Sequence, residues 1–280
     1  MFGNSVIIHI IRTENSLKTT TNYLILNQAC ADLMITIAEG INAIHYSLMD
    51  NSWIGGLLGL ITCKVFLAVV FSSHMFSLWV LATIAVERFY AVTRPLRSSP
   101  VSQHFKKTIL LLWVLCIATP SNFLQKASFK TLNNSYYCDF ANVLQEWTIL
   151  NIITGGLLAF LPFLIIVTLY TKVCFKLWSR QVPGEGSTQN AQQAEAVKTA
   201  KKVTLMMIAV VVLYIVCWLP MFISVILDYI SYLELNGSLL LFVLWLISTF
   251  SGLNPYVYLT YNQKFRSGFN KLFRNCRGKI

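Results

Sequence analysis

Long apolar runs alternate with short polar segments along nearly the whole chain. Each run is long enough to cross about 30 Å of hydrocarbon as a helix. The six runs are residues 23–48, 60–86, 108–124, 147–170, 203–227 and 238–261. A shorter apolar piece, Val6–Ile11, precedes them. Because lipid offers no hydrogen-bond partner to free backbone groups, such runs must be helical. We therefore expect an all-α membrane protein whose first span is truncated at its N-terminus, the chain being a fragment.

Composition excludes an ordinary soluble domain. Hydrophobic residues make up 56% of the 280 residues and charged residues only 12%, with a mean hydropathy of +0.61. Soluble domains carry about 25% charged residues. Of the 22 Lys and Arg, all except Lys64, Lys126 and Lys130 fall in alternate polar segments and in the tail. The positive-inside rule then predicts a multi-pass protein with a cytoplasmic C-terminus.

The net charge of +11 follows from this asymmetry and faces anionic lipid. Because the basic residues are dispersed between spans, no nucleic-acid partner is expected. We expect a single domain over 1–280. A Pro-, Gly-, Ser- and Gln-rich stretch at about 181–196 predicts a flexible inner loop. A short amphipathic eighth helix is expected at about 262–274, and Cys276 after it is a candidate for palmitoylation.

Two cysteines and two sequons fall in the segments expected outside the cell. An oxidising exterior favours pairing Cys63 with Cys138. Asn133 (Asn-Asn-Ser) and Asn236 (Asn-Gly-Ser) are predicted N-glycosylation sites.

Ionisable residues inside the spans are candidates for function, because each is expensive to bury in lipid. Asp32 lies midway along the run 23–48, and Glu39 follows two helical turns later. His74 lies within the next run, which ends in the adjacent pair Glu87 and Arg88. A proline also interrupts each of three runs and predicts kinked helices; these are Pro162, Pro220 and Pro255.

Seven short motifs occur in order, each on its own run. They are GNSV (3–6), ACADL (29–33), ERF (87–89), Trp113, Pro162 with Tyr170, CWLP (217–220) and NPYVY (254–258). With them the chain resembles a rhodopsin-like (class A) G-protein-coupled receptor, most like the neuropeptide-receptor branch, over nearly its whole length. The resemblance implies a seven-transmembrane helix bundle in the plasma membrane that is not an enzyme. It also implies an extracellular ligand, a heterotrimeric G protein, arrestin and receptor kinases as partners.

The resemblance assigns a role to the charged pair. At rest Arg88 would stay with Glu87. On activation Arg88 would turn inward, near Tyr170 and Tyr258, and open a cleft for a helix of the G protein.

The resemblance also implies an ion site and a toggle. Asp32, Ser77, Ser251 and Asn254 match positions that hold sodium in relatives, and oxygen ligands suit a hard cation. A protonated Asp32 in a water network is the alternative. No other cofactor is expected. The toggle and kinks would comprise Trp218, Pro220, Pro162, Tyr214, Asn254 and Pro255. Tyr214 and Gln28 depart from the family pattern, as does Ala200, where some relatives carry an acid.

Two positions narrow the range of ligand classes that the chain could bind. Val70 stands where amine receptors have an aspartate, and Ser248 stands where opsins have a lysine, so neither ligand class is expected. The outer acids lean toward a cationic or amidated peptide. A lipid or another small non-amine ligand suits the apolar side chains equally well. The expected pocket comprises Glu39, Val70, His74, Met221, Phe222, Asp228 and Leu244. A transporter is disfavoured because neither repeated halves nor broken helices are found. An intramembrane enzyme is disfavoured because no H-E-x-x-H pattern is found and the four histidines are scattered.

Overall fold

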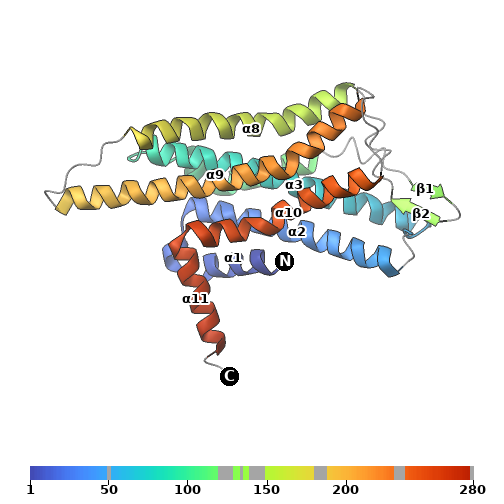
Figure 1. Ribbon diagram of the computed structural model, residues 1–280, viewed down its shortest axis with the longest axis horizontal. Coiled ribbons are helices and arrows are strands. Elements are labelled where there is room, and N and C mark those ends of the chain that lie inside the picture. The colour runs from blue at the N-terminus through green and yellow to red at the C-terminus, as the bar shows by residue number, and fades with distance from the viewer. Residues whose placement is uncertain are drawn as a thin grey trace.

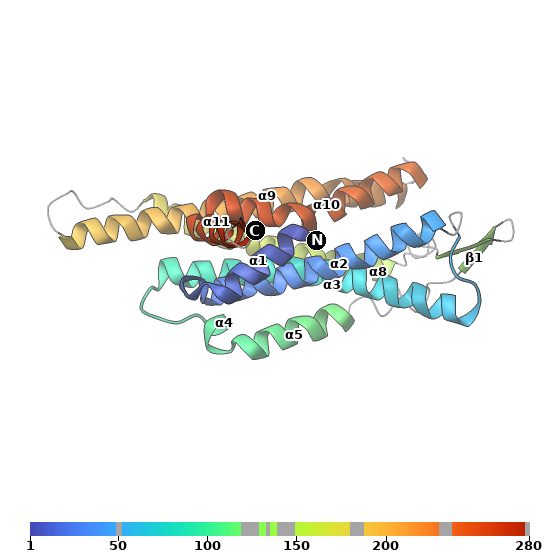
Figure 2. The same ribbon diagram turned by 90° about the horizontal axis from the view of Figure 1, so that it is seen from below.

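The computed structural model describes residues 1–48, 52–118, 129–132, 135–138, 149–179, 188–229 and 237–277. Long helices lie side by side along one axis (Figure 1), and α5 lies at one edge of the bundle in the turned view (Figure 2). In chain order the elements are α1 (Phe2–Thr13), the short 3-10 turn η1 (Asn15–Leu17), α2 (Thr20–Leu48), α3 (Gly56–Thr93), α4 (Pro100–Gln103), α5 (Phe105–Ala118), β1 (Phe129–Leu132), β2 (Ser135–Cys138), α8 (Ile149–Trp178), α9 (Thr188–Tyr229), α10 (Gly237–Tyr261) and α11 (Gln263–Arg277).

Among the described residues, five helices are long and apolar enough to cross a membrane, and they lie in α2, α3, α8, α9 and α10. They coincide with five of the six predicted runs. The remaining run, 108–124, corresponds to α5, which the structure describes over 14 residues. The 12 residues of α1 rise about 18 Å, which is less than the hydrocarbon thickness.

The third helix forms the centre of the bundle. It is apolar all round, as expected of a helix surrounded by other helices. The residues between Ser72 and Ala85 are largely buried. Phe76 of α3 stacks on Trp113 of α5 with 3.9 Å between ring centroids. We call the end of the bundle that carries Arg88 the Arg88 end, and the end that carries Cys63 the disulfide end.

Helix α11 leaves α10 at a steep angle and packs against α1 near the Arg88 end (Figure 1). Gly268 permits this approach, because a Cβ there would lie 2.6 Å from Cγ2 of Ile10. Lys271 forms an ion pair with Glu14 at 2.8 Å. The amphipathic eighth helix expected at about 262–274 thus corresponds to a helix over Gln263–Arg277.

Two details differ from the sequence-based expectation. The expected loop at about 181–196 is shorter, since α9 already begins at Thr188. The helix breakers of that stretch, Pro183, Gly184 and Gly186, all precede Thr188, whereas the Ala-, Gln- and Glu-rich remainder favours a helix. A two-stranded antiparallel hairpin, β1 with β2, accompanies the helices at the disulfide end.

Candidate functional site

Four polar residues form a stripe along one face of α2. Thr21, Gln28, Asp32 and Glu39 are spaced by seven, four and seven residues. At about 100° per residue this spacing places them within about 40° of one line along the helix. Each of the four side chains forms a hydrogen bond with α3, with α10 or with both, and no two of them share a partner. The stripe therefore links the two ends of the bundle through polar contacts.

Asp32 is the centre of the stripe and is fully buried. Its Oδ1 accepts a hydrogen bond from Ser77 Oγ of α3 at 2.8 Å, and its Oδ2 accepts one from Asn254 Nδ2 of α10 at 2.9 Å. Asn4 of α1 donates to the backbone oxygen of Ser251 at 2.9 Å. Four helices thus meet around one carboxylate.

Three buried oxygens in this region have no hydrogen-bond partner among the described residues: Asn4 Oδ1, Ser251 Oγ and Asn254 Oδ1. A buried polar atom without a partner is costly. A carboxylate, a hydroxyl and amide oxygens form the donor set that a hard cation prefers. The residues assigned to sodium from the sequence are therefore chemically suited to hold it, with Asn4 as an additional neighbour.

Glu87 and Arg88 do not pair with each other in this structure. Glu87 Oε2 accepts a hydrogen bond from Ser99, the N-cap of α4. Arg88 Nη2 donates to Thr21 Oγ1 of α2. Adjacent residues on a helix do not face each other, so each charged group finds a hydroxyl on a different neighbouring element. The resting pair expected from the sequence is thus not formed in this conformation.

Tyr258 is held between α2 and α11. Its hydroxyl donates to Gln28 Oε1 at 3.0 Å. Its ring stacks on that of Phe265, with 6.1 Å between centroids. Tyr258 and Tyr170 are both buried in the core. Gln28, which departs from the family pattern, therefore provides the acceptor that fixes Tyr258.

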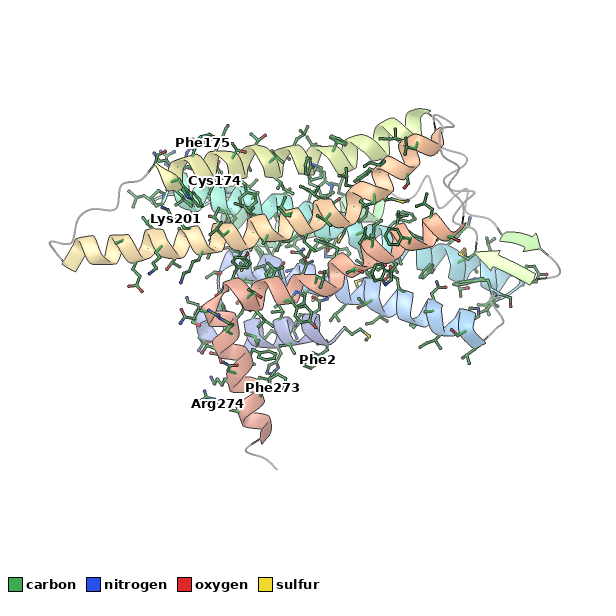
Figure 3. All side chains as sticks on the ribbon, in the orientation of Figure 1. Phe2, Cys174, Phe175, Lys201, Phe273 and Arg274 are labelled. Carbon is green, nitrogen blue, oxygen red and sulfur yellow. A yellow bond between two sulfur atoms is a disulfide. The ribbon has the colours of Figure 1, made fainter. Side chains whose placement is uncertain are left out.

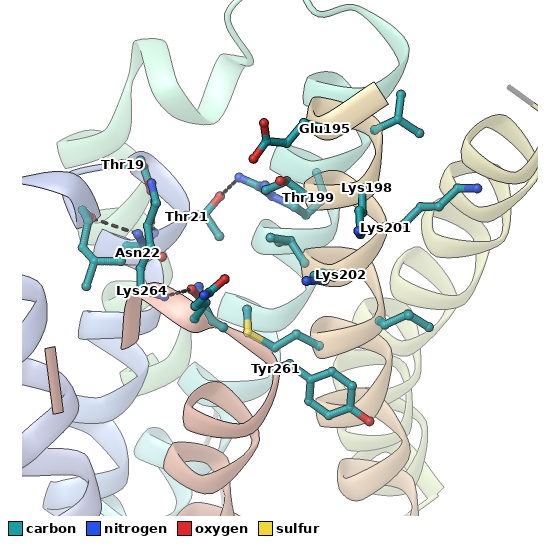
Figure 4. Close-up of a pocket in the computed structure, with 18 of the residues that line it drawn as sticks. Thr19, Thr21, Asn22, Glu195, Lys198, Thr199, Lys201, Lys202, Tyr261 and Lys264 are labelled. Carbon is teal, nitrogen blue, oxygen red and sulfur yellow. Dashed lines mark hydrogen bonds between the residues drawn. The ribbon is translucent and has the colours of Figure 1, made fainter. Parts of the chain in front are cut away.

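A cavity of about 1040 Å³ opens at the Arg88 end (Figure 4). Its walls come from α2, α3, α9 and the junction of α10 with α11. Arg88 lines it, together with four lysines and one acid, Glu195. The lysines are Lys198, Lys201, Lys202 and Lys264.

Trp218 lies at the middle of an aromatic stack in α9. Its ring centroid lies 5.4 Å from that of Tyr214 and 6.1 Å from that of Phe222. Tyr214 in turn meets Phe250 of α10 edge to face at 5.4 Å. The predicted toggle residues thus contact one another, and Pro162, Pro220 and Pro255 all lie inside helices as expected.

His74 of α3 contacts this stack from the side. Its ring meets Trp218 edge to face at 5.3 Å, and its Nδ1 lies 2.8 Å from the backbone oxygen of Val70. His74 Nε2 and Trp218 Nε1 have no hydrogen-bond partner among the described residues. Two buried ring nitrogens at this depth therefore lack a protein partner among the described residues.

Glu39 occupies the disulfide-end half of the stripe. Its Oε1 accepts a hydrogen bond from Ser248 Oγ of α10 at 2.7 Å. The remaining pocket candidates that the structure describes are partly exposed; they are Val70, Met221, Phe222 and Leu244.

Cys63 and Cys138 form a disulfide with 5.6 Å between Cα atoms, as predicted. It joins the start of α3 to the end of β2. Trp53 reinforces this junction, because its backbone nitrogen donates to Tyr136 and its indole donates to Gly59 at 2.9 Å. The hairpin is thereby fixed to α3.

Some predicted residues lie outside what the structure describes. Asn133 and Asn236 fall in undescribed segments, and the side chains of Asp228 and Cys276 are also outside the described set. Their assignments stay predictions.

Sequence reasoning missed Thr21 and Ser99 as partners of the charged pair. The spacing of Thr21 from Asp32 carried a usable signal, since eleven residues is close to three helical turns. Ser99 carried another, because a serine followed by proline is a typical helix start.

Comparison with known proteins agrees with this geometry. Residues 3–258 match the family model described as 7 transmembrane receptor (rhodopsin family). The substance-P receptors of Canis lupus familiaris and Homo sapiens are each 30% identical over 285 residues, covering 98% of this chain and 68% of the relative. The Tachykinin-like peptides receptor 99D of Drosophila melanogaster is 27% identical over 294 residues, covering 98% of this chain and 54% of the relative. The chain therefore belongs to the rhodopsin family of seven-transmembrane receptors.

Proposed function

We propose that this chain binds an extracellular peptide and activates heterotrimeric G proteins from the Arg88 end, which faces the cytoplasm. The observation that carries the proposal is the cavity of about 1040 Å³ at this end, with Arg88 in its wall and not paired with Glu87. A released arginine beside an open cavity is what a receptor needs in order to accept a helix in a groove. The four lysines of the cavity wall support a cytoplasmic orientation.

The polar stripe offers a path between the two ends. A ligand that contacts Glu39 or the His74–Trp218 pair would act on residues that touch α2, α3, α9 and α10. Asp32 joins three of these helices, α2, α3 and α10, by hydrogen bonds. A shift of α10 would move Tyr258 relative to Gln28, and through it the Arg88 end. This is a two-state element that ligand and G protein would both bias.

The peptide assignment rests on the carboxylate of Glu39 and on the relatives. Glu39 keeps one oxygen on Ser248 and has a second with further lone pairs for a ligand. A protonated amine, a guanidinium or a C-terminal amide of a peptide can donate to it. One relative is named as a receptor for tachykinin-like peptides. An apolar lipid or small molecule is the second candidate, because Val70, Met221, Phe222 and Leu244 are partly exposed and apolar.

Displacement binding with a panel of short peptides tests the ligand class. Each peptide is supplied as C-terminal amide and as free acid, with and without a basic residue, to the receptor in lipid nanodiscs. We expect amidated or basic members to bind. Glu39→Gln should weaken them at least tenfold, which is the loss of roughly one charge-assisted hydrogen bond. Glu14→Gln, which removes an acid paired with Lys271 far from the pocket, is the matched control.

Binding of lipids or uncharged small molecules alone, unaffected by Glu39→Gln, would contradict the peptide assignment and favour the second candidate. Loss of affinity in both variants would show that surface charge, and not Glu39, attracts the ligand.

Asp32, Ser77, Ser251 and Asn254 would hold a sodium ion that favours one conformation of the bundle. Support comes from the buried oxygens without partners in this region. The ion would supply a positive charge that compensates the buried carboxylate. The residues themselves join α2, α3 and α10, so binding there would restrain the relative positions of three helices.

Arrestin and receptor kinases are further expected partners on the cytoplasmic side, by analogy with the family. Glycosylation of Asn133 and Asn236 and palmitoylation of Cys276 belong to the same proposal. The first two sites would lie outside the cell and the third at the inner membrane surface.

A further inference from the structure

A second hollow lies on the outward side of the bundle between α8 and α9, with a volume of about 470 Å³. Its wall is mostly aliphatic and aromatic. The lining includes Ile166, Val167 and Phe175 from α8 and Ile208, Val211 and Val212 from α9. Phe175 is 72% exposed and Val212 53% exposed, so the groove opens to the surroundings of the protein. In a protein that spans the membrane, these surroundings are lipid chains.

At the side of the groove that points toward the Arg88 end lies the ammonium group of Lys201. Lys201 precedes Ile208 by seven residues, so it lies on the same face of α9, about 10 Å further along the helix. Its Nζ lies 5.3 Å from the ring centroid of Trp178, which lines the groove from α8. Figure 3 shows Cys174, Phe175 and Lys201 near one another at the α8–α9 boundary.

Lys201 has no ion-pair partner among the described residues. Its charged neighbours in sequence and on the facing helix are Lys198, Lys202 and Lys176, with Glu195 as the nearest acid along α9. The local field at the end of the groove is therefore positive. The contact with the face of the Trp178 ring holds the ammonium group at this position. The N–H groups that point away from the ring can donate to a ligand.

We infer that this groove binds an anionic phospholipid, with one acyl chain between α8 and α9 and the phosphate at Lys201. The orientation follows from the chemistry. The apolar wall begins beside Lys201 and continues toward the middle of the bundle, as a lipid chain does below its headgroup. Basic pockets between membrane helices on the cytoplasmic side are known to suit anionic headgroups. Lys201 also lines the cavity at the Arg88 end, but the inference rests on the α8–α9 groove and not on ligand or G-protein binding.

Photo-crosslinking tests the inference on the unmodified chain. The receptor is placed in nanodiscs with phosphatidylserine or phosphatidylcholine that carries a diazirine in one acyl chain, at equal mole fraction. Labelled peptides are then quantified by mass spectrometry. The peptide 166–178 of α8 reports the groove. The peptide 105–118 of α5, with Leu110 and Leu111 exposed, reports ordinary lipid contact.

We expect the phosphatidylserine preference at 166–178 to exceed that at 105–118 about fivefold, the ratio that one lysine near an anionic headgroup confers. Lys201→Gln should remove this preference. Lys202→Gln is the matched control, because Lys202 is adjacent to Lys201 and, like it, lines the cavity at the Arg88 end, but it is not placed over the Trp178 ring. It should keep the preference.

Equal headgroup preference at the two peptides would overturn the inference, as would equal effects of the two lysine variants. Efficient Cys174–Cys174 cross-linking between two receptors in native membranes, with no lipid label at 166–178, would also overturn it. That result would assign the groove to a second copy of the chain.

Discussion

Replacing Asp32 with Asn separates the charge of this residue from its shape. The carboxylate accepts hydrogen bonds at 2.8 Å from Ser77 and at 2.9 Å from Asn254. An asparagine keeps one oxygen and gains an NH₂ group. The amide of Asn254 can turn so that its Oδ1, which has no partner now, accepts from that NH₂. The fold should therefore tolerate the change.

The size of the effect follows from the two hydrogen bonds. A bond to a charged acceptor contributes roughly 1.5–3 kcal/mol and a neutral one roughly 0.5–1.5 kcal/mol. Replacing two bonds to a charged acceptor by two bonds to a neutral one therefore lowers the stability of the folded state by about 2 kcal/mol. Removing the buried charge offsets part of this loss. Sodium adds a separate contribution. At ten times its dissociation constant, an ion that binds only the folded state stabilises it by about 1.4 kcal/mol.

Thermal unfolding in detergent measures this contribution without any ligand. The midpoint is compared in sodium chloride and in N-methylglucamine chloride at equal ionic strength. We expect sodium to raise the midpoint of the unmutated receptor and not that of Asp32→Asn. Glu14→Gln removes an equal charge at the surface and should keep the sodium shift. An equal sodium shift in Asp32→Asn and the unmutated receptor would refute the site. No shift in either would favour a protonated Asp32 in a water network.

Three further predictions follow from the contacts described above. Arg88→Ala should abolish G-protein nucleotide exchange while changing ligand affinity less than about fivefold, below the usual range of allosteric coupling; full exchange by a well-expressed variant would be inconsistent with the role given to Arg88. Mass spectrometry of non-reduced peptides should recover Cys63 linked to Cys138, and two free thiols in folded protein would contradict the hairpin tether. Gly268→Ala should lower stability by about 1–3 kcal/mol relative to Gly252→Ala in calorimetry, because its Cβ meets Ile10 whereas that of residue 252 meets nothing within 4 Å; equal stability would mean that α11 does not pack on α1 as described.

The spans could be predicted from sequence because an apolar run of about 20 residues has few other structures open to it. The helix ends could not. Helix α9 extends through the polar residues from Thr188 onward, where no lipid boundary marks its start. The hairpin was also missed, since β1 and β2 have four residues each, too few for alternation to stand out.

Within the site, the motifs identified which residues matter but not always what they touch. Asp32 contacts Ser77 and Asn254 as the resemblance implied. Glu87 and Arg88 instead bind separate hydroxyls. Adjacency in sequence suggested a pair, although neighbours on a helix point in different directions. Only the packing of α2 and α4 against α3 determines which hydroxyl each one reaches.

We propose that ligand binding at the disulfide end activates a G protein at the Arg88 end. The most direct measurement is guanine-nucleotide exchange by purified heterotrimeric G proteins with the receptor in nanodiscs, with and without the peptide that binds best in the displacement panel. We expect peptide to accelerate exchange, and Arg88→Ala to remove the acceleration while peptide still binds. Peptide binding without faster exchange for any class of G protein, in the unmutated receptor, would contradict it.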